Sequence, residues 1–245
     1  MKKISILIIV LINLVLASCT KAIPEGPIKD FVDKLDYDLA YQQINTGKSI
    51  ITATYYVDDQ IDGQVTSTTY IDKTNLKYHY ITTDVVGSFV GTGSGKYNYQ
   101  NQEILCYMNE DSTTTVYKKT DDVSEEIKYN ENDVNVSINN FFYLELEANY
   151  HRGGVYYGDY IIANCAKYYS CFSLDETKKE LSYEVNTSSV NSAGDEIVTM
   201  HKFTVNEYGM ILTLSSKSIY LAKNIVMETT ISCEYNIPIE KKVAL

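Results

Sequence analysis

Alternation of apolar and polar residues with a period of two is the feature that most constrains the fold of this chain. It begins at Ser49 and returns, between short polar turns, as far as Tyr235. In an antiparallel sheet, such alternation places one face in the core and leaves the other face in water. The sequence therefore predicts a mainly β domain of the α+β class, built on an antiparallel sheet.

The turn residues between the alternating runs predict a meander of short strands. The expected strands cover residues 49–57, 65–71, 76–80, 96–100, 103–108, 113–119, 179–187, 197–205, 210–219 and Ile225–Tyr235. Turns are expected at 58–63, 72–75 and 206–209, and a glycine-rich loop at 91–95.

Two segments depart from this period. Residues 28–39 carry apolar side chains at helical spacing, and Pro27 and Gly47 suit the start and exit of one N-terminal helix packed on the sheet. The middle of the chain reads as polar loop or irregular helix at 121–133. Residues 137–149, which include Phe141 and Phe142, are expected to form a helical insertion packed on the sheet.

The N-terminus has the layout of a secretory signal peptide. Lys2 and Lys3 precede a nearly unbroken apolar run, Ile4 to Leu16, and small residues follow. An uncleaved membrane span is the alternative. As a helix, residues 4–18 would reach only about 22 Å of the roughly 30 Å hydrocarbon core.

The residues Leu16-Ala17-Ser18-Cys19 resemble the lipobox of bacterial lipoproteins. The resemblance implies cleavage between Ser18 and Cys19 and a diacylglycerol thioether on Cys19. We therefore expect a signal peptide at 1–18, a lipidated tether at 19–27 and one β-rich domain at 28–245. The expected location is the cell membrane, where the lipid anchors the protein on its extracytoplasmic face.

The charge of the chain restricts its partners. Without Lys2 and Lys3 it keeps 19 basic residues against 32 acidic ones, a formal charge of −13. Nucleic acids need a basic surface, so we expect no nucleic-acid partner. Anionic headgroups also repel such a chain, which leaves the lipid as the membrane contact.

Four cysteines remain after Cys19, and they permit two disulfides in three pairings. Cys165 and Cys171 are close enough in sequence for a small disulfide loop. Cys106 and Cys233 lie in apolar strands, either as the second disulfide or as reduced core residues. Their spacing does not fit a zinc site.

No catalytic or metal-binding pattern emerges from the remaining residues. His79, His151 and His201 are far apart in sequence, and His201 shares the apolar face of its strand, as a core histidine would. The 91–97 segment lacks the first glycine and the final hydroxyl residue of a P-loop. The 58–63 segment lacks carboxylates of a calcium loop. We expect neither enzymatic activity nor a cofactor.

The order of elements after the lipobox resembles that of the periplasmic lipoprotein carriers LolA and LolB and the related mycobacterial lipid-carrying lipoproteins. The resemblance covers residues 28–235 and lies in element order, without matching residue motifs. It implies a strongly curved half-barrel sheet, with helices over a cavity for acyl chains.

Two functions remain open at this point. One is binding of lipid or another hydrophobic ligand in a cavity of the curved sheet. The other is a surface structural or interaction lipoprotein with a filled core, which contacts cell-envelope polymer or protein through exposed tyrosines.

Overall fold

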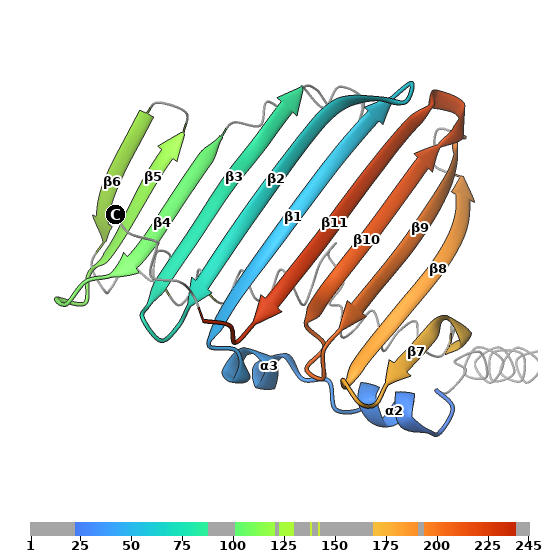
Figure 1. Ribbon diagram of the computed structural model, residues 1–245, viewed down its shortest axis with the longest axis horizontal. Coiled ribbons are helices and arrows are strands. Elements are labelled where there is room, and N and C mark those ends of the chain that lie inside the picture. Colours follow the sequence, from blue (N-terminus) through green and yellow to red (C-terminus); the bar gives the residue numbers. More distant parts are fainter. Residues whose placement is uncertain are drawn as a thin grey trace, which may run out of the picture.

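Two meanders of consecutive strands meet where β1 pairs with β11, and together they form one antiparallel sheet (Figure 1). This computed structural model describes residues 23–87, 101–120, 123–129, 138, 142, 169–190 and 194–238. Over those residues the strand order is β6-β5-β4-β3-β2-β1-β11-β10-β9-β8-β7. The strands are β1 (Thr46–Val57), β2 (Gln60–Asp72), β3 (Lys77–Gly87), β4 (Gln102–Met108), β5 (Thr114–Thr120), β6 (Val123–Tyr129), β7 (Phe172–Asp175), β8 (Glu180–Val190), β9 (Glu196–Val205), β10 (Ile211–Tyr220) and β11 (Ile225–Tyr235).

The sheet is open, because β6 and β7 are its two edges and do not pair with each other. The expected fold class, mainly β with a curved antiparallel half-barrel, is confirmed. The bounds of β11 agree with the prediction, and most other expected strands are longer than predicted. The expected strand at 96–100 and the loop at 91–95 lie outside the described residues.

Alternation along the strands gives the sheet two distinct faces. On β11, Ile231 and Cys233 are buried, whereas Ser232 and Glu234, which alternate with them, are exposed. We call the face that carries the buried side chains the inner face and the opposite one the outer face. Register then assigns every paired residue to one of them, since partners in adjacent strands point to the same side.

The β1–β2 hairpin turns on two residues. Asp58 and Asp59 have φ values of 50° and 61°, the left-handed conformation that two-residue hairpins require. The predicted turn at 58–63 is therefore real but shorter, and Gly63 lies in β2. Asn224, in the β10–β11 connection, donates from Nδ2 to Asp58 Oδ1 at 2.9 Å and ties the two hairpins together.

The single N-terminal helix predicted over 28–39 is wrong. Two short helices, α2 (Pro27–Val32) and α3 (Tyr37–Gln43), take its place, and both lie at one end of the strands (Figure 1). Asp36 starts the second helix, because its Oδ1 accepts a hydrogen bond from the Leu39 backbone N–H at 3.1 Å. Leu39, expected on the buried stripe, is 41% exposed.

Gly47 does not end a helix, contrary to the prediction. It lies in β1, where an added Cβ would stand 3.1 Å from Ile71 Cγ1 on the neighbouring strand. Gly47 therefore permits close approach of a core side chain to the backbone.

The break between α2 and α3 lets each helix cover a different core. Cluster 1 lies under α2 and contains Phe31, Val32, Phe172, Leu181, Tyr183, Phe203, Val205, Ile211, Leu214, Ile231 and Cys233. Cluster 2 lies under α3 and contains Ala40, Ile44, Ile71, Tyr78, Cys106, Val116, Ile138, Phe142 and Met210. Tyr235 packs against both clusters, and its hydroxyl donates to the Ile211 carbonyl at 3.0 Å.

The expected mid-chain helix is described at only two positions. Ile138 and Phe142 are helical and fully buried, and both belong to cluster 2. Both side chains therefore pack on the inner face of the sheet. Phe141 and the rest of 137–149 lie outside the described residues.

Two strands were not predicted. β6 occupies 123–129, within the segment expected to be loop or irregular helix, and pairs with β5 over its whole length. Most of its side chains are exposed, so pairing and not burial makes it a strand. β7 is a four-residue edge strand that packs beside α2.

None of the helices in the described ranges is long and apolar enough to span a membrane.

Candidate functional site

The inner face changes character along the strands. Its helix end is filled by clusters 1 and 2, whereas toward the hairpin end, near Asp58, several small side chains lie among larger ones. We call these side chains the small-residue band: Ala53 on β1, Thr229 on β11, Ser216 and Ser218 on β10, and Thr199 on β9. Register brings them together, since Ala53 pairs with Thr229, Thr229 with Ser216, and Ser218 with Thr199.

Larger side chains border the small-residue band on both sides. Leu214 and Ile231 lie toward the helices, and Ile197, Tyr220 and Ile225 toward the hairpins. Met227, which is 36% exposed, and His201 are the register partners of Ser218 and Ser216, so larger side chains also stand within the band. The face is thus filled at one end and unevenly covered by its own side chains at the other.

The titratable groups beside the small-residue band are held in their neutral forms. Burial raises the pKa of the Tyr55 hydroxyl above its ordinary value, and burial lowers the pKa of His201 below 6.5. His201 also makes edge contacts with the rings of Tyr183 and Phe203, at centroid distances of 6.3 and 5.6 Å. This agrees with the expectation of a core histidine.

The charges near this end are paired with each other. Lys223, in the β10–β11 connection, donates to Asp195 Oδ2 at 2.8 Å, and this contact raises the pKa of the lysine. The inner face at its hairpin end therefore offers hydroxyl and apolar groups, with a neutralised ion pair at its rim.

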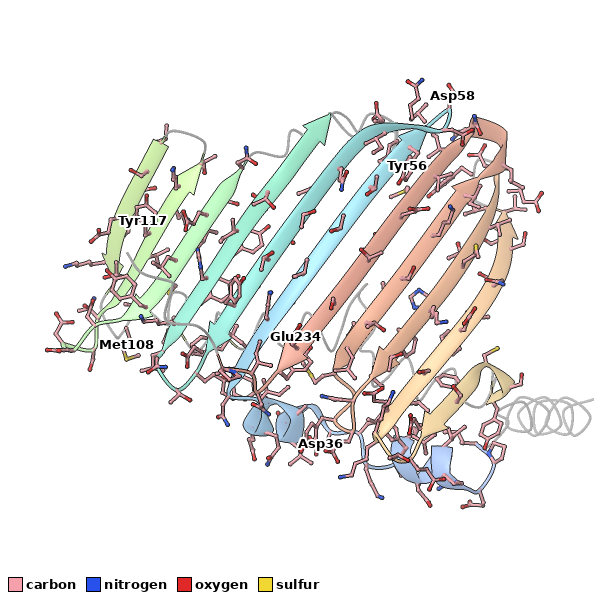
Figure 2. The ribbon with its side chains drawn as sticks, in the orientation of Figure 1. Asp36, Tyr56, Asp58, Met108, Tyr117 and Glu234 are labelled. Atoms are coloured by element: carbon pink, nitrogen blue, oxygen red, sulfur yellow. The ribbon has the colours of Figure 1, made fainter. Side chains whose placement is uncertain are left out.

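The outer face is polar and solvent-exposed over much of β8–β11 and β1, whereas on β3–β5 it carries the buried side chains of His79, Leu105 and Thr115. Cross-strand ion pairs join Lys202 to Glu184 at 2.9 Å and Lys217 to Glu228 at 2.6 Å, and Thr52 shares a hydrogen bond with Thr66. One apolar row interrupts it near the hairpins. We call this the outer apolar row, and register aligns its members, Val198, Ile219, Val226, Tyr56 and Ile61, across β9, β10, β11, β1 and β2. Tyr56 lies beside Asp58, at the end of the sheet opposite Asp36 (Figure 2).

The predicted lipidation and cleavage residues, Cys19 and Ser18, lie outside the described residues, as do Cys165 and His151. Cys171 ends the short 3₁₀ helix Tyr169–Cys171 as a half-buried free thiol, and its disulfide with Cys165 stays a prediction.

Cys106 and Cys233 are buried free thiols, as the core interpretation expected. They lie on β4 and β11, which are four strand steps apart in the sheet. At about 4.8 Å per step the separation is roughly 19 Å, far beyond the reach of a disulfide.

The two described histidines do not lie together. His79 and His201 point to opposite faces, from β3 and β9. Within the described ranges, no three His, Cys, Asp or Glu side chains converge as a metal site would require.

Sequence reasoning missed the small-residue band and the outer apolar row. Ala53 and Ser216 each interrupt a series of larger inner-face residues, and that interruption is visible in the sequence. Their alignment into one surface depends on strand register, which the sequence does not state.

Comparison with known proteins finds no matching family model and no matching curated protein. The chain is similar to a DUF1329 family protein from Desulfovibrio piger at 8% identity, with a TM-score of 0.25 over 88% of this chain and 96% of that one. It is also similar to a β-barrel-like DUF1849 protein from Brucella abortus at 8% identity, with a TM-score of 0.21 over 80% and 99%. The third is a putative outer membrane lipoprotein-sorting protein domain from Vibrio parahaemolyticus at 6% identity, with a TM-score of 0.23 over 88% and 96%. Similarity at this level does not establish a family.

Proposed function

We propose that the protein is a membrane-anchored extracytoplasmic lipoprotein that binds lipid or another hydrophobic ligand on the hairpin end of its inner face. The observation that carries the proposal is the small-residue band. It lies on the same face as two packed cores, with apolar side chains on both sides, and a ligand would complete the apolar layer there. The neutral forms of Tyr55 and His201 suit an apolar ligand, because neither group then brings an unpaired charge to an apolar surface.

The anchor part of the proposal rests on the sequence at Cys19. Ile23 already packs against cluster 1, so only residues 20–22 separate a lipidated Cys19 from the folded domain. At 3.3–3.6 Å per residue, the four steps between Cys19 and Ile23 span at most about 14 Å. The α2 end of the sheet would then face the membrane, and the small-residue band would point away from it.

Replacement of Cys19 tests the anchor. The full chain with Cys19→Ala should lose the acyl mass and leave the membrane fraction, or stay unprocessed. A mutant chain that remains in the membrane, together with a wild-type chain free of acyl groups, would contradict lipidation.

Native mass spectrometry tests ligand binding with a matched pair of variants. Ser216 and Ser215 are adjacent, but Ser216 lies in the small-residue band whereas Ser215 is exposed on the outer face. The wild-type chain should carry acyl lipid, Ser216→Trp should retain at most about a tenth of it, and Ser215→Trp should retain all of it. Absence of lipid from the wild-type chain after incubation with phospholipid, or equal loss from both variants, would refute the proposal.

The outer apolar row favours a second candidate, a surface lipoprotein that contacts another envelope component. Ile61 is 51% exposed, and Met200 and Leu221 nearby are 45% and 55% exposed. Contiguous apolar surface on a wet face is typical of interaction sites. This candidate predicts that Ile61→Asp disrupts the contact with the envelope component, while the amount of lipid retained by the protein stays unchanged.

A further inference from the structure

A polar cleft lies where β3 and β4 stop pairing, away from the small-residue band. The last register partners of these two strands are Ile81 and Glu103. Beyond them, the Thr82 hydroxyl accepts from the Gln102 N–H at 2.6 Å and donates to the Gln102 carbonyl at 3.3 Å. The cleft has a volume of about 190 Å³, and its lining residues are Ile81, Thr82, Asn101, Gln102, Glu103 and Lys119.

A buried histidine holds the carboxylate of this cleft. His79 Nε2 lies 2.8 Å from Glu103 Oε1, and the ring, only 9% exposed, stacks on Tyr70. His79 Nδ1 is buried and finds no hydrogen-bond partner among the described residues. An unpartnered N–H there would cost more than an unpartnered lone pair, so the geometry favours the tautomer in which the Nε2–H group donates a hydrogen bond to Glu103 Oε1.

The histidine also separates Glu103 from its cross-strand partner. Lys119 on β5 is in register with Glu103 on the outer face. Lys202 and Glu184 are also cross-strand register partners on the outer face, as are Lys217 and Glu228, and both of these pairs form ion pairs. Across the described residues, no carboxylate lies within ion-pair distance of Lys119. The cleft thus presents an anion and a cation that do not neutralise each other.

We propose that this cleft binds a small zwitterion with a free ammonium and a free carboxylate, such as an α-amino acid. Glu103 accepts hydrogen bonds from the ammonium, and Lys119 donates to the carboxylate. Ile81 supplies an apolar wall. The volume of about 190 Å³ suits a ligand of amino-acid size.

Charge complementarity predicts which ligands are rejected. A ligand with only a carboxylate brings Glu103 a like charge, and a ligand with only an ammonium does the same to Lys119. The zwitterion should therefore bind more tightly than either singly charged analogue, by roughly tenfold or more.

The test is an NMR titration of the full chain with three ligands of the same shape. L-leucine is the zwitterion, L-leucinamide lacks the carboxylate and N-acetyl-L-leucine lacks the ammonium. L-leucine should bind at least tenfold more tightly than the other two. Glu103→Gln should abolish its advantage over N-acetyl-L-leucine, and Lys119→Gln its advantage over L-leucinamide. The outer-face variants Glu184→Gln and Lys202→Gln are the matched controls and should change nothing.

Three results would overturn the proposal: no saturable shift with L-leucine, equal affinity for all three ligands, or tighter binding of N-acetylglucosamine than of L-leucine.

His79 acts as a positioning residue, because it holds Glu103 away from Lys119. His79→Phe should therefore reduce the preference for L-leucine over L-leucinamide, even where the unfolding midpoint stays close to that of the wild-type chain. An unchanged preference would refute that role.

Discussion

Alkylation of Cys106 offers a sharp test of the packing of cluster 2. The thiol is fully buried in cluster 2, and burial raises its pKa from 9.0 to about 12, because the thiolate would lose its hydration. At pH 8 a thiol with a pKa of 9.0 is about one-tenth thiolate, whereas one with a pKa of 12 is about one part in 10,000 thiolate. Ionisation alone should slow alkylation of Cys106 by about a thousandfold relative to the unfolded chain, and exclusion of the reagent slows it further.

The assay treats the full chain, reduced beforehand, with iodoacetamide at pH 8 and follows each cysteine by peptide mass spectrometry. The half-buried Cys171 serves as the internal comparison in the native protein, and the urea-unfolded chain restores reactivity at Cys106. Alkylation of native Cys106 within about tenfold of its rate in the unfolded chain would refute the burial of this thiol, because an exposed thiol would ionise and react normally.

Three further predictions concern stability and are measured by urea unfolding. Phe203→Ala removes a fully buried ring of cluster 1 and should lower the free energy of unfolding by about 3–5 kcal/mol. Val190→Ala, at a 67% exposed position, should lower it by at most about 0.5 kcal/mol. Equal losses would contradict the packing of the inner face. Asp36→Ala removes the N-cap of α3 and should cost about 1 kcal/mol, and no measurable loss would contradict this cap. Burial lowers the pKa of His201 below 6.5, so the unfolded chain binds the proton more readily; the stability it contributes is present above pH 6.5 and is lost as pH falls through the lowered pKa. His201→Phe should reduce this acid sensitivity, and an unchanged pH profile would show that other groups dominate it.

Local sequence patterns were sufficient where a strand has one buried face. The alternation in β11 and the turn at 206–209 were predicted correctly, because period-two burial and turn residues act over a few positions. β6 was missed because it has no such burial pattern. Its side chains are mostly exposed, and its backbone hydrogen bonds to β5 stabilise it as a strand. The helical spacing of 28–39 likewise concealed the new N-cap at Asp36.

The candidate sites depended far more on tertiary structure. The lipobox resemblance at Cys19 is a local motif and could be read directly from the chain. The small-residue band draws on β9, β10, β11 and β1, and the polar cleft on β3, β4 and β5. Each strand contributes only one or two residues, and no spacing along the chain indicates that they meet.

The sequence by itself determined that this chain forms an antiparallel sheet with one wet face, because that outcome follows from alternation within each strand. Only the tertiary structure decided which strands are neighbours, that Cys106 and Cys233 are about 19 Å apart, and that Glu103 bonds to His79 and not to Lys119. The physical reason is the range of the interactions. Burial patterns and turns act between residues close in sequence, whereas register and cross-strand contacts join residues that only the complete sheet brings together.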